Sequence, residues 1–195
     1  GNSTYSIVPD QIEAGTFMIA ALASKGDILI KNCITKHLEC LTAKILEIGG
    51  NVEEDGDNIR VWCTSRPQKA NIKTLPYPGF PTDMQPQIVV TLAIATGTSI
   101  VTESIFENRF KIVEELAKMG ADITVSGKKA IINGTGRLYG TELIAKDLRG
   151  GAALVLAALG AEGASTISGY SHIKRGYENF VGNLSDLGVS IKESV

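Results

Sequence analysis

The chain has 195 residues, of which 44% are hydrophobic and 21% charged, and its net charge is −2. This length and composition are typical of one globular domain, or of two small ones, that folds without disulfides or metals. The weak net charge argues against a polybasic surface for nucleic acids or membranes, and no apolar run is long enough to span a bilayer. We expect residues 1–3 to be a cloning remnant and residues 4–195 to form a single domain.

Glycine is enriched, with 21 residues, and the glycines mark an internal repeat. One order of landmarks occurs three times: an Asp, an Ala-rich apolar helix, a glycine, a short β-branched strand, a helix with an apolar stripe, and a second glycine. The paired glycines of the three copies are Gly26 and Gly49, Gly97 and Gly120, and Gly163 and Gly188. The sequence therefore predicts three units, at about residues 8–70, 80–140 and 141–195.

The first two units follow the full pattern. Short strands are expected at residues 28–30 and 100–101, and each unit is expected to end in a hairpin, around residues 54–57 and 126–128. The third unit has a strand at 166–167 and then only one hairpin strand.

That last strand is expected at Val189 and Ile191. Its partner is supplied either by residues 4–8 or by a longer parent protein.

Each unit reads as βαβαββ, and three such small sheets cannot each bury one face alone. The prediction is an α/β fold in which the units surround a pseudo-threefold axis, with helices inside and sheets outside.

The charged residues recur at equivalent places. Asp10, Asp83 and Asp147 each precede an apolar helix, as expected of N-caps. Second helices are expected to open at His37, Arg109 and Arg175, and Arg149 lies two residues after Asp147. A cation at a helix N-terminus opposes the helix dipole, so these residues favour a bound anion at one end of the domain. The alternative is that the arginines form ion pairs with the same aspartates.

Other candidate groups are weaker. Cys33, Cys40 and Cys63 form no C-x-x-C pair and are expected to be inert thiols. His172 is expected to pack or to form a hydrogen bond. No metalloprotease, nucleophile-elbow or Walker motif is present, and the glycines of residues 134–137 lack dinucleotide-binding spacing. We expect no cofactor and no metal.

Five strings are distributed along nearly the whole chain: Pro9-Asp-Gln-Ile-Glu-Ala-Gly-Thr16, Phe80-Pro-Thr-Asp-Met-Gln85, Ser104-Ile-Phe-Glu-Asn-Arg-Phe110, Ala145-Lys-Asp-Leu-Arg149 and His172-Ile-Lys-Arg-Gly-Tyr-Glu178. Together they resemble the UDP-N-acetylglucosamine 1-carboxyvinyltransferase family of enolpyruvyl transferases. Family proteins have two inside-out domains of three βαβαββ units each, and this chain resembles only the second half.

The resemblance implies that the enzyme moves the enolpyruvyl group of phosphoenolpyruvate to the 3-hydroxyl of UDP-N-acetylglucosamine. This is the first committed step of peptidoglycan synthesis, in the bacterial cytoplasm. Asp83 would contact the attacking hydroxyl and act as a general base. Ile105 would contact the UDP-sugar through its backbone, and Arg149 and Arg175 would bind phosphoenolpyruvate.

Arg109 and Asp147 would position substrate or those arginines. The missing partner would be the N-terminal domain, and the fragment alone is expected to be inactive.

The sequence departs from the family pattern at Gln11, Gly150 and Lys174, where a basic residue, an alanine and an aspartate are usual. At Gln11 a charge often seen near the cleft is therefore absent, whereas the changes at Gly150 and Lys174 remove no proposed ligand. The family's proton-donor Cys and N-terminal Lys have no counterpart in this chain, and none of its three cysteines matches that context. Two alternatives remain: an enzyme that uses shikimate 3-phosphate as acceptor, and a non-catalytic threefold scaffold in which the arginines only pair with acids.

Overall fold

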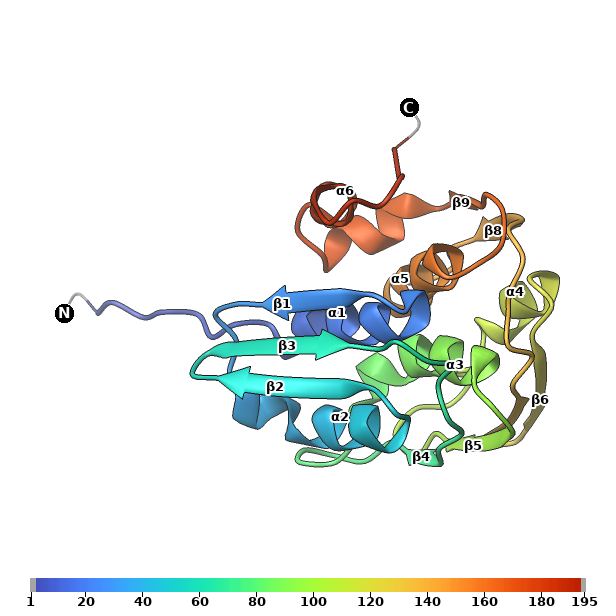
Figure 1. The fold of residues 1–195 in the computed structure, drawn as a ribbon, viewed down its shortest axis with the longest axis horizontal. Helices are drawn as coiled ribbons and strands as arrows, with labels where there is room; N and C mark the ends of the chain where they lie inside the picture. The colour runs from blue at the N-terminus through green and yellow to red at the C-terminus, as the bar shows by residue number, and fades with distance from the viewer. Residues whose placement is uncertain (1–2, 194–195) are drawn as a thin grey trace.

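The computed structural model describes residues 3–193 (Figure 1), so residues 1 and 2 of the expected cloning remnant lie outside the described residues, as do 194 and 195. The helices are α1 (Gln11–Ser24), α2 (Thr35–Glu47), α3 (Gln85–Ile94), α4 (Val113–Lys118), α5 (Leu148–Leu159) and α6 (Phe180–Asp186), with 3-10 helices η1 (Thr82–Met84) and η2 (Tyr170–Arg175). The strands are β1 (Asp27–Ile30), β2 (Asn51–Asp55), β3 (Asn58–Trp62), β4 (Ile72–Lys73), β5 (Thr98–Thr102), β6 (Asp122–Ser126), β7 (Lys129–Asn133), β8 (Glu142–Ile144) and β9 (Thr166–Ser168).

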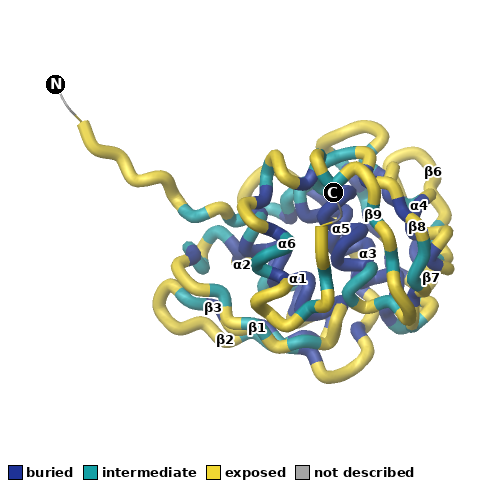
Figure 2. The backbone as a smooth tube through the Cα atoms, turned by 90° about the horizontal axis from the view of Figure 1, so that it is seen from above, coloured by how far each residue is buried: buried dark blue, intermediate teal, exposed yellow. Residues whose placement is uncertain are grey.

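Three helices, α1, α3 and α5, form the centre of the molecule and contact one another. They are apolar on nearly all sides, as expected for helices without a solvent face. Every residue of α3 is buried, and Figure 2 shows buried backbone concentrated along these helices. Polar residues of α3 are buried with the rest, including Gln85, Gln87 and Thr91. Among them, Gln87 donates hydrogen bonds to Thr16 and Tyr177 inside the core.

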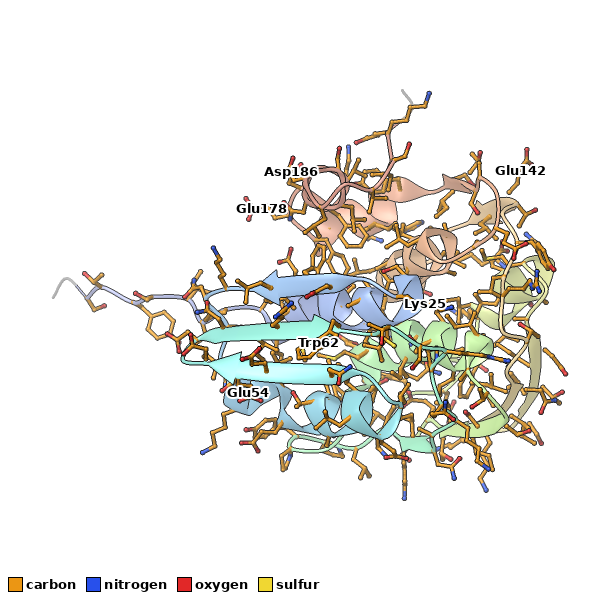
Figure 3. All side chains as sticks on the ribbon, in the orientation of Figure 1. Lys25, Glu54, Trp62, Glu142, Glu178 and Asp186 are labelled. Carbon is orange, nitrogen blue, oxygen red and sulfur yellow. The ribbon has the colours of Figure 1, made fainter. Side chains whose placement is uncertain are left out.

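The sheets surround these helices and belong to successive stretches of the chain. The first has the order β1-β3-β2 and is antiparallel. The second, β4-β5-β7-β6, pairs β4 with β5 in parallel and its other strands antiparallel, and the third is the parallel pair β8-β9. On the outer side of β3, Arg60 is exposed and Trp62 partly exposed, and the Arg60 guanidinium lies 5.0 Å from the ring centroid of Trp62. Figure 3 labels Trp62 at the end of β3. The predicted α/β fold, helices inside and sheets outside, is confirmed.

The second glycine of each unit has the same backbone conformation. Gly49, Gly120 and Gly188 follow α2, α4 and α6 with φ values of 91°, 90° and 89°. A side chain is strained in this left-handed region, so glycine is the residue that ends these helices at low conformational cost. The glycine excess noted in the sequence therefore arises in part from repeated helix stops.

Two of the three expected N-caps are present. The Asp10 carboxylate accepts a hydrogen bond from the Ile12 amide at 2.7 Å, and that of Asp147 accepts one from the Gly150 amide at 2.8 Å. Asp83 does not cap a helix, because it lies inside η1 and its carboxylate has other partners. This departure from the threefold pattern singles out Asp83.

Two expectations for the second helices were wrong. α4 and α6 begin at Val113 and Phe180, several residues after Arg109 and Arg175. Residues 109–112 form turns rather than an α-helix, and the left-handed Asn179, with φ 47°, interrupts any helix that would run on from Arg175. Only the first unit is close to the prediction, with His37 as the third residue of α2.

The expected strand at Val189 and Ile191 was also wrong, because residues 188–193 form no strand. Both side chains are partly buried against the core instead. Residues 4–8 supply no partner strand either; Tyr5 and Ile7 are 83% and 89% exposed on an extended segment that leaves the body of the molecule (Figure 1).

A buried acid connects the second and third units. Glu115 of α4 has a side chain 4% exposed, and its Oε2 accepts hydrogen bonds from Lys118 Nζ at 2.7 Å and from the Ile144 amide of β8 at 3.1 Å. Burial alone would raise the pKa of Glu115, but these hydrogen bonds outweigh it and hold the pKa below its ordinary value. The ionised form of Glu115 therefore stabilises the fold.

Candidate active site

The Asp83 carboxylate bridges two arginines that are distant in the sequence. Its Oδ1 accepts a hydrogen bond from Arg109 Nη2 at 2.8 Å. Its Oδ2 lies 3.2 Å from Arg149 Nη2 and 3.3 Å from Arg149 Nε. The ion-pair alternative considered from the sequence is therefore observed for Asp83 with Arg109 and Arg149. We call these three residues the Asp83 cluster.

Each member of the Asp83 cluster comes from a different structural element. Asp83 lies in η1, directly before the buried helix α3. Arg149 is the second residue of α5, in the turn that Asp147 caps. Arg109 follows the left-handed Asn108 in the loop between β5 and α4. α3 and α5 pack together in the core, and the Asp83–Arg149 contact shows that η1 and the first turn of α5 meet at one end of these helices.

The first turn of α5 is held by close packing. A Cβ on Gly151 would lie 2.8 Å from Ile173 Cγ1, closer than such contacts ordinarily come. Gly150 is less confined, because its nearest neighbour would be the side chain of Asp147 at 3.1 Å. The glycine at position 151 therefore lets η2 approach the helix that carries Arg149.

Aromatic rings lie against both guanidinium groups. The Phe106 ring centroid is 5.5 Å from Arg109 Cζ, and the Tyr177 ring centroid is 5.4 Å from Arg149 Cζ. Both separations are within the range of cation–π attraction. Burial alone would lower the pKa of Arg149, but Tyr177, Asp83 and Asp10 raise it, so this guanidinium stays charged.

A cavity of about 350 Å³ opens beside the Asp83 cluster. Its lining comes from η1, the loop before α4 and the first turn of α5, which carry the cluster: Asp83, Phe106, Glu107, Asn108, Arg109, Lys111, Ile112, Asp147, Leu148, Arg149 and Gly150. Four of the six predicted site residues therefore line one cavity: Asp83, Arg109, Asp147 and Arg149.

The other two predicted residues lie outside this lining. Ile105 is 40% exposed, and its amide donates to Glu103 Oε1 at 2.8 Å, so a backbone contact to a ligand would have to come from its carbonyl oxygen. Arg175 ends η2, where its Nη2 lies 2.7 Å from His172 Nδ1. Since a guanidinium only donates, that ring nitrogen accepts the hydrogen bond. His172 thus forms the hydrogen bond expected of it.

Glu103 is a residue that sequence reasoning missed. The residue is 1% exposed, and its Oε1 accepts hydrogen bonds from Thr74 Oγ1 and from the amides of Ile105 and Phe106. Its Oε2 accepts one from Thr82 Oγ1 at 2.9 Å. Glu103 therefore fastens the loop that carries Arg109 to the residue before Asp83. The partners lie far apart in the sequence, so no local pattern predicts this role.

Negative charge gathers near the start of α1. Burial, Asp10 and Glu178 together raise the pKa of Glu13. Glu178 lies near α6, as Figure 3 shows. An ionised Glu13 is therefore unfavourable in the folded chain.

The cysteines do not contribute to the cavity lining. The Cys33 thiol lies 3.3 Å from the Asp57 carbonyl oxygen and the Cys63 thiol 3.2 Å from the Ser65 carbonyl oxygen, so both are engaged near the first sheet. Burial raises the pKa of the Cys33 and Cys40 thiols, which makes the reactive thiolate scarcer.

Within residues 3–193, no three His, Cys, Asp or Glu side chains are grouped so that they could hold a metal ion. In the same part of the chain, no helix combines the length and apolar character needed to cross a bilayer.

The chain belongs to the EPSP synthase (3-phosphoshikimate 1-carboxyvinyltransferase) family, whose sequence model matches residues 1–184.

Similar proteins have a more specific name than the family model. The chain is 54% identical over 188 residues to UDP-N-acetylglucosamine 1-carboxyvinyltransferase from Clostridium botulinum, covering 96% of this chain and 45% of that protein. It is 50% identical over 187 residues to the protein of the same name from Desulfofundulus thermocisternus, covering 96% of this chain and 77% of that protein. With exceptions such as the latter, the chain spans about half the length of the curated relatives it matches.

Solved structures agree on the fold. The enolpyruvyl transferase NikO from Streptomyces tendae is similar with a TM-score of 0.85 and 27% identity, over 94% of this chain and 44% of that one. EPSP synthase from Acinetobacter baumannii is similar with a TM-score of 0.77 over 97% of this chain and 48% of that one, and at 19% identity it supports the fold alone.

Proposed function

We propose that this chain is the C-terminal half of a UDP-N-acetylglucosamine 1-carboxyvinyltransferase, which transfers the enolpyruvyl group of phosphoenolpyruvate to the 3-hydroxyl of UDP-N-acetylglucosamine and releases phosphate. The observation that carries the proposal is the Asp83 cluster: one carboxylate bridging two guanidinium groups beside a cavity. The names of relatives at about 50% identity support the choice of acceptor. On the same resemblance, the reaction belongs to peptidoglycan synthesis in the bacterial cytoplasm.

The two arginines suit the anionic substrate. Phosphoenolpyruvate carries a phosphate and a carboxylate, and a guanidinium can bind either group with two parallel hydrogen bonds. Buried Arg149 Nη1 and Arg109 Nε have no hydrogen-bond partner among the described residues. Unsatisfied buried donors are unfavourable, so a rearrangement that gives them an anionic acceptor would be favoured.

The same contacts suggest how Asp83 is made available. In the ligand-free arrangement, Asp83 accepts from both arginines. An anion that took over those N–H groups would free the carboxylate to accept the proton of the attacking 3-hydroxyl. The hydroxyl oxygen would then bond to C2 of phosphoenolpyruvate while C3 gains a proton; loss of a proton from C3 and of phosphate from C2 would complete the transfer. The C3 proton donor would come from the complementary half.

The remaining predicted residues would support this arrangement. Asp147 caps the helix turn that carries Arg149 and so fixes its backbone. Ile105 would offer its carbonyl oxygen to the UDP-sugar. Arg175 would reach phosphoenolpyruvate only after a change in side-chain position, since it lies outside the cavity lining.

The test is phosphate release from phosphoenolpyruvate, measured with this chain and with the complete protein. We expect no turnover from the chain alone and turnover that depends on UDP-N-acetylglucosamine from the complete protein. Arg149→Ala should lower kcat/KM by at least about 100-fold without preventing folding. Arg137→Ala is the matched control, because Arg137 is exposed and its ion pair within residues 3–193 is with the exposed Glu162. Turnover by the isolated chain, or an Arg149→Ala enzyme as active as the Arg137→Ala control, would contradict the proposal.

Two alternatives give different results. The family description names 3-phosphoshikimate, so an enzyme of that kind would release phosphate with shikimate 3-phosphate and not with the amino-sugar nucleotide. The scaffold alternative takes the ion pairs of Asp83 as purely structural. In that case Arg149→Ala would unfold the protein, and no acceptor would support turnover.

A further inference from the structure

Tyr177 is a buried residue between η2 and α6 whose ring lies against Arg149. The residue is 3% exposed, and its ring centroid is 5.4 Å from Arg149 Cζ. The Phe180 ring packs against it at a centroid distance of 4.8 Å, and Phe180 in turn contacts Phe17 of α1 at 5.7 Å. The Tyr177 ring is therefore fixed by the aromatic core while it contacts a guanidinium of the Asp83 cluster.

The hydroxyl of Tyr177 is bound inside the helical core. It lies 2.9 Å from Thr16 Oγ1 of α1 and 3.3 Å from Gln87 Nε2 of α3, and both of these residues are fully buried. Thr16 Oγ1 lies 2.7 Å from the Ile12 carbonyl oxygen, which can only accept, so the single Thr16 proton is used there.

It follows that the Tyr177 hydroxyl donates to Thr16 Oγ1. Gln87 Nε2 has two protons and donates to Thr16 Oγ1 at 3.2 Å and to the Tyr177 oxygen. Every proton in this network therefore has one acceptor, and the direction of each bond is determined. A phenol held by such a network cannot rotate away from Arg149 without leaving buried polar groups unpaired, which is unfavourable.

The backbone beside Tyr177 also packs on the turn that carries Arg149. A Cβ on Gly176 would lie 2.6 Å from Leu148 Cδ2, so only glycine permits this approach without displacement of a neighbour. Gly176 therefore packs closely against Leu148, in the first turn of α5. The ring of Tyr177 therefore has a fixed position relative to Arg149.

We propose that Tyr177 is the positioning residue of Arg149: its hydroxyl, anchored by Thr16 and Gln87, fixes the ring, and the ring holds the guanidinium in the orientation that binds the anionic substrate. This inference rests on the proposed function. The long Arg149 side chain can adopt many rotamers, so holding one of them costs conformational entropy. In the structure its guanidinium donates a hydrogen bond to Asp83. When an anion displaces Asp83, the Tyr177 ring is the contact that stays in place.

The first test uses this chain and needs no activity. The Nε–H group of Arg149 gives a ¹⁵N–¹H NMR signal that Arg149→Lys assigns by its loss. We expect Tyr177→Phe, which keeps the ring, and Thr16→Val, which removes the same hydrogen bond from the other side, each to speed solvent exchange of this N–H about tenfold. Thr16→Ser keeps the hydroxyl and is the matched control. Unchanged exchange in both Tyr177→Phe and Tyr177→Leu would overturn the proposal.

The second test uses the complete enzyme. Tyr177→Phe and Thr16→Val should raise the KM for phosphoenolpyruvate about five- to tenfold, with the KM for UDP-N-acetylglucosamine unchanged. A merely structural role would lower the amount of active enzyme and leave both KM values as they were, and that result overturns the proposal. If the complete protein transfers no enolpyruvyl group, the proposed function fails, while the NMR result still decides whether Tyr177 holds Arg149.

Discussion

Replacement of Asp83 by Asn removes the negative charge that Arg109 and Arg149 share while keeping the size of the side chain. Loss of one partner from a fully buried ion pair costs about 3–5 kcal/mol, whereas an exposed pair contributes at most about 1 kcal/mol. The Arg149 side chain is 15% exposed and that of Asp83 is 38% exposed, which places this pair between the two cases. We expect the variant to lose about 1–3 kcal/mol of unfolding free energy, or about 3–10 °C in Tm.

The same substitution should strengthen anion binding, because Asp83 competes with an anion for both guanidinium groups. For charges roughly 5 Å apart in an effective dielectric constant of about 60, Coulomb's law gives about 1 kcal/mol of repulsion between the carboxylate and a singly charged anion. Removal of that repulsion corresponds to about fivefold tighter binding. A less stable protein that binds anions more tightly is an unusual combination, and it follows only if the cluster is an anion site.

The assay is a phosphate titration of this chain followed by ³¹P NMR or calorimetry, alongside thermal unfolding by circular dichroism. Asp186→Asn is the matched control, since it changes net charge equally at the end of α6, outside the cavity lining (Figure 3). Phosphate affinity in Asp83→Asn that is equal to or weaker than in the control would refute the reasoning.

Four further predictions concern the stability and thiol reactivity of this chain. Glu115→Gln should unfold at lower temperature than the wild type at pH 7, and the difference should vanish as pH falls through the depressed pKa of Glu115, because that stabilisation exists only while the acid is ionised. Glu13→Gln should have the opposite effect on stability. Burial and neighbouring acids raise the pKa of Glu13, so above that pKa its ionisation destabilises the folded chain. The variant should therefore be more stable than the wild type at pH 7 but not at pH 3. Thermal unfolding across pH measures both, and a shared sign would contradict the assignment. Gly151→Ala should destabilise the chain by about 1–3 kcal/mol because its Cβ has no room. Gly150→Ala, whose Cβ would meet only the Asp147 carboxylate at 3.1 Å, should destabilise it less; equal unfolding midpoints would count against this packing. Cys33 should react slowly with a thiol reagent until the chain unfolds, since burial raises its pKa, and rapid native labelling would contradict that.

The parts of the fold that depend on local rules were predictable from the sequence. An Asp before an apolar run predicts an N-cap, and Asp10 and Asp147 satisfy it. The repeated glycines predict helix stops, and alternation around a turn predicts a hairpin; both are observed. Asp83 and Arg149 come together through packing rather than local rules, because α3, which follows Asp83, packs against α5, which carries Arg149.

The errors share one physical cause, which is dependence on distant partners. Val189 alternates with Ile191 as a strand would, but a strand also needs a neighbouring edge, and neither residue pairs with one. Arg175 was expected to open a helix but ends η2 instead, where the His172 ring nitrogen accepts its hydrogen bond. Glu103 joins residues 74, 82, 105 and 106, a combination that exists only after the chain has folded.

The most direct test of the central claim is phosphate release from phosphoenolpyruvate by the complete protein, offered either UDP-N-acetylglucosamine or shikimate 3-phosphate, in wild-type and Asp83→Asn forms. The account predicts release only with UDP-N-acetylglucosamine, and a loss of at least about 100-fold in kcat for Asp83→Asn. Release with shikimate 3-phosphate instead, or an Asp83→Asn enzyme with the wild-type rate, would contradict it.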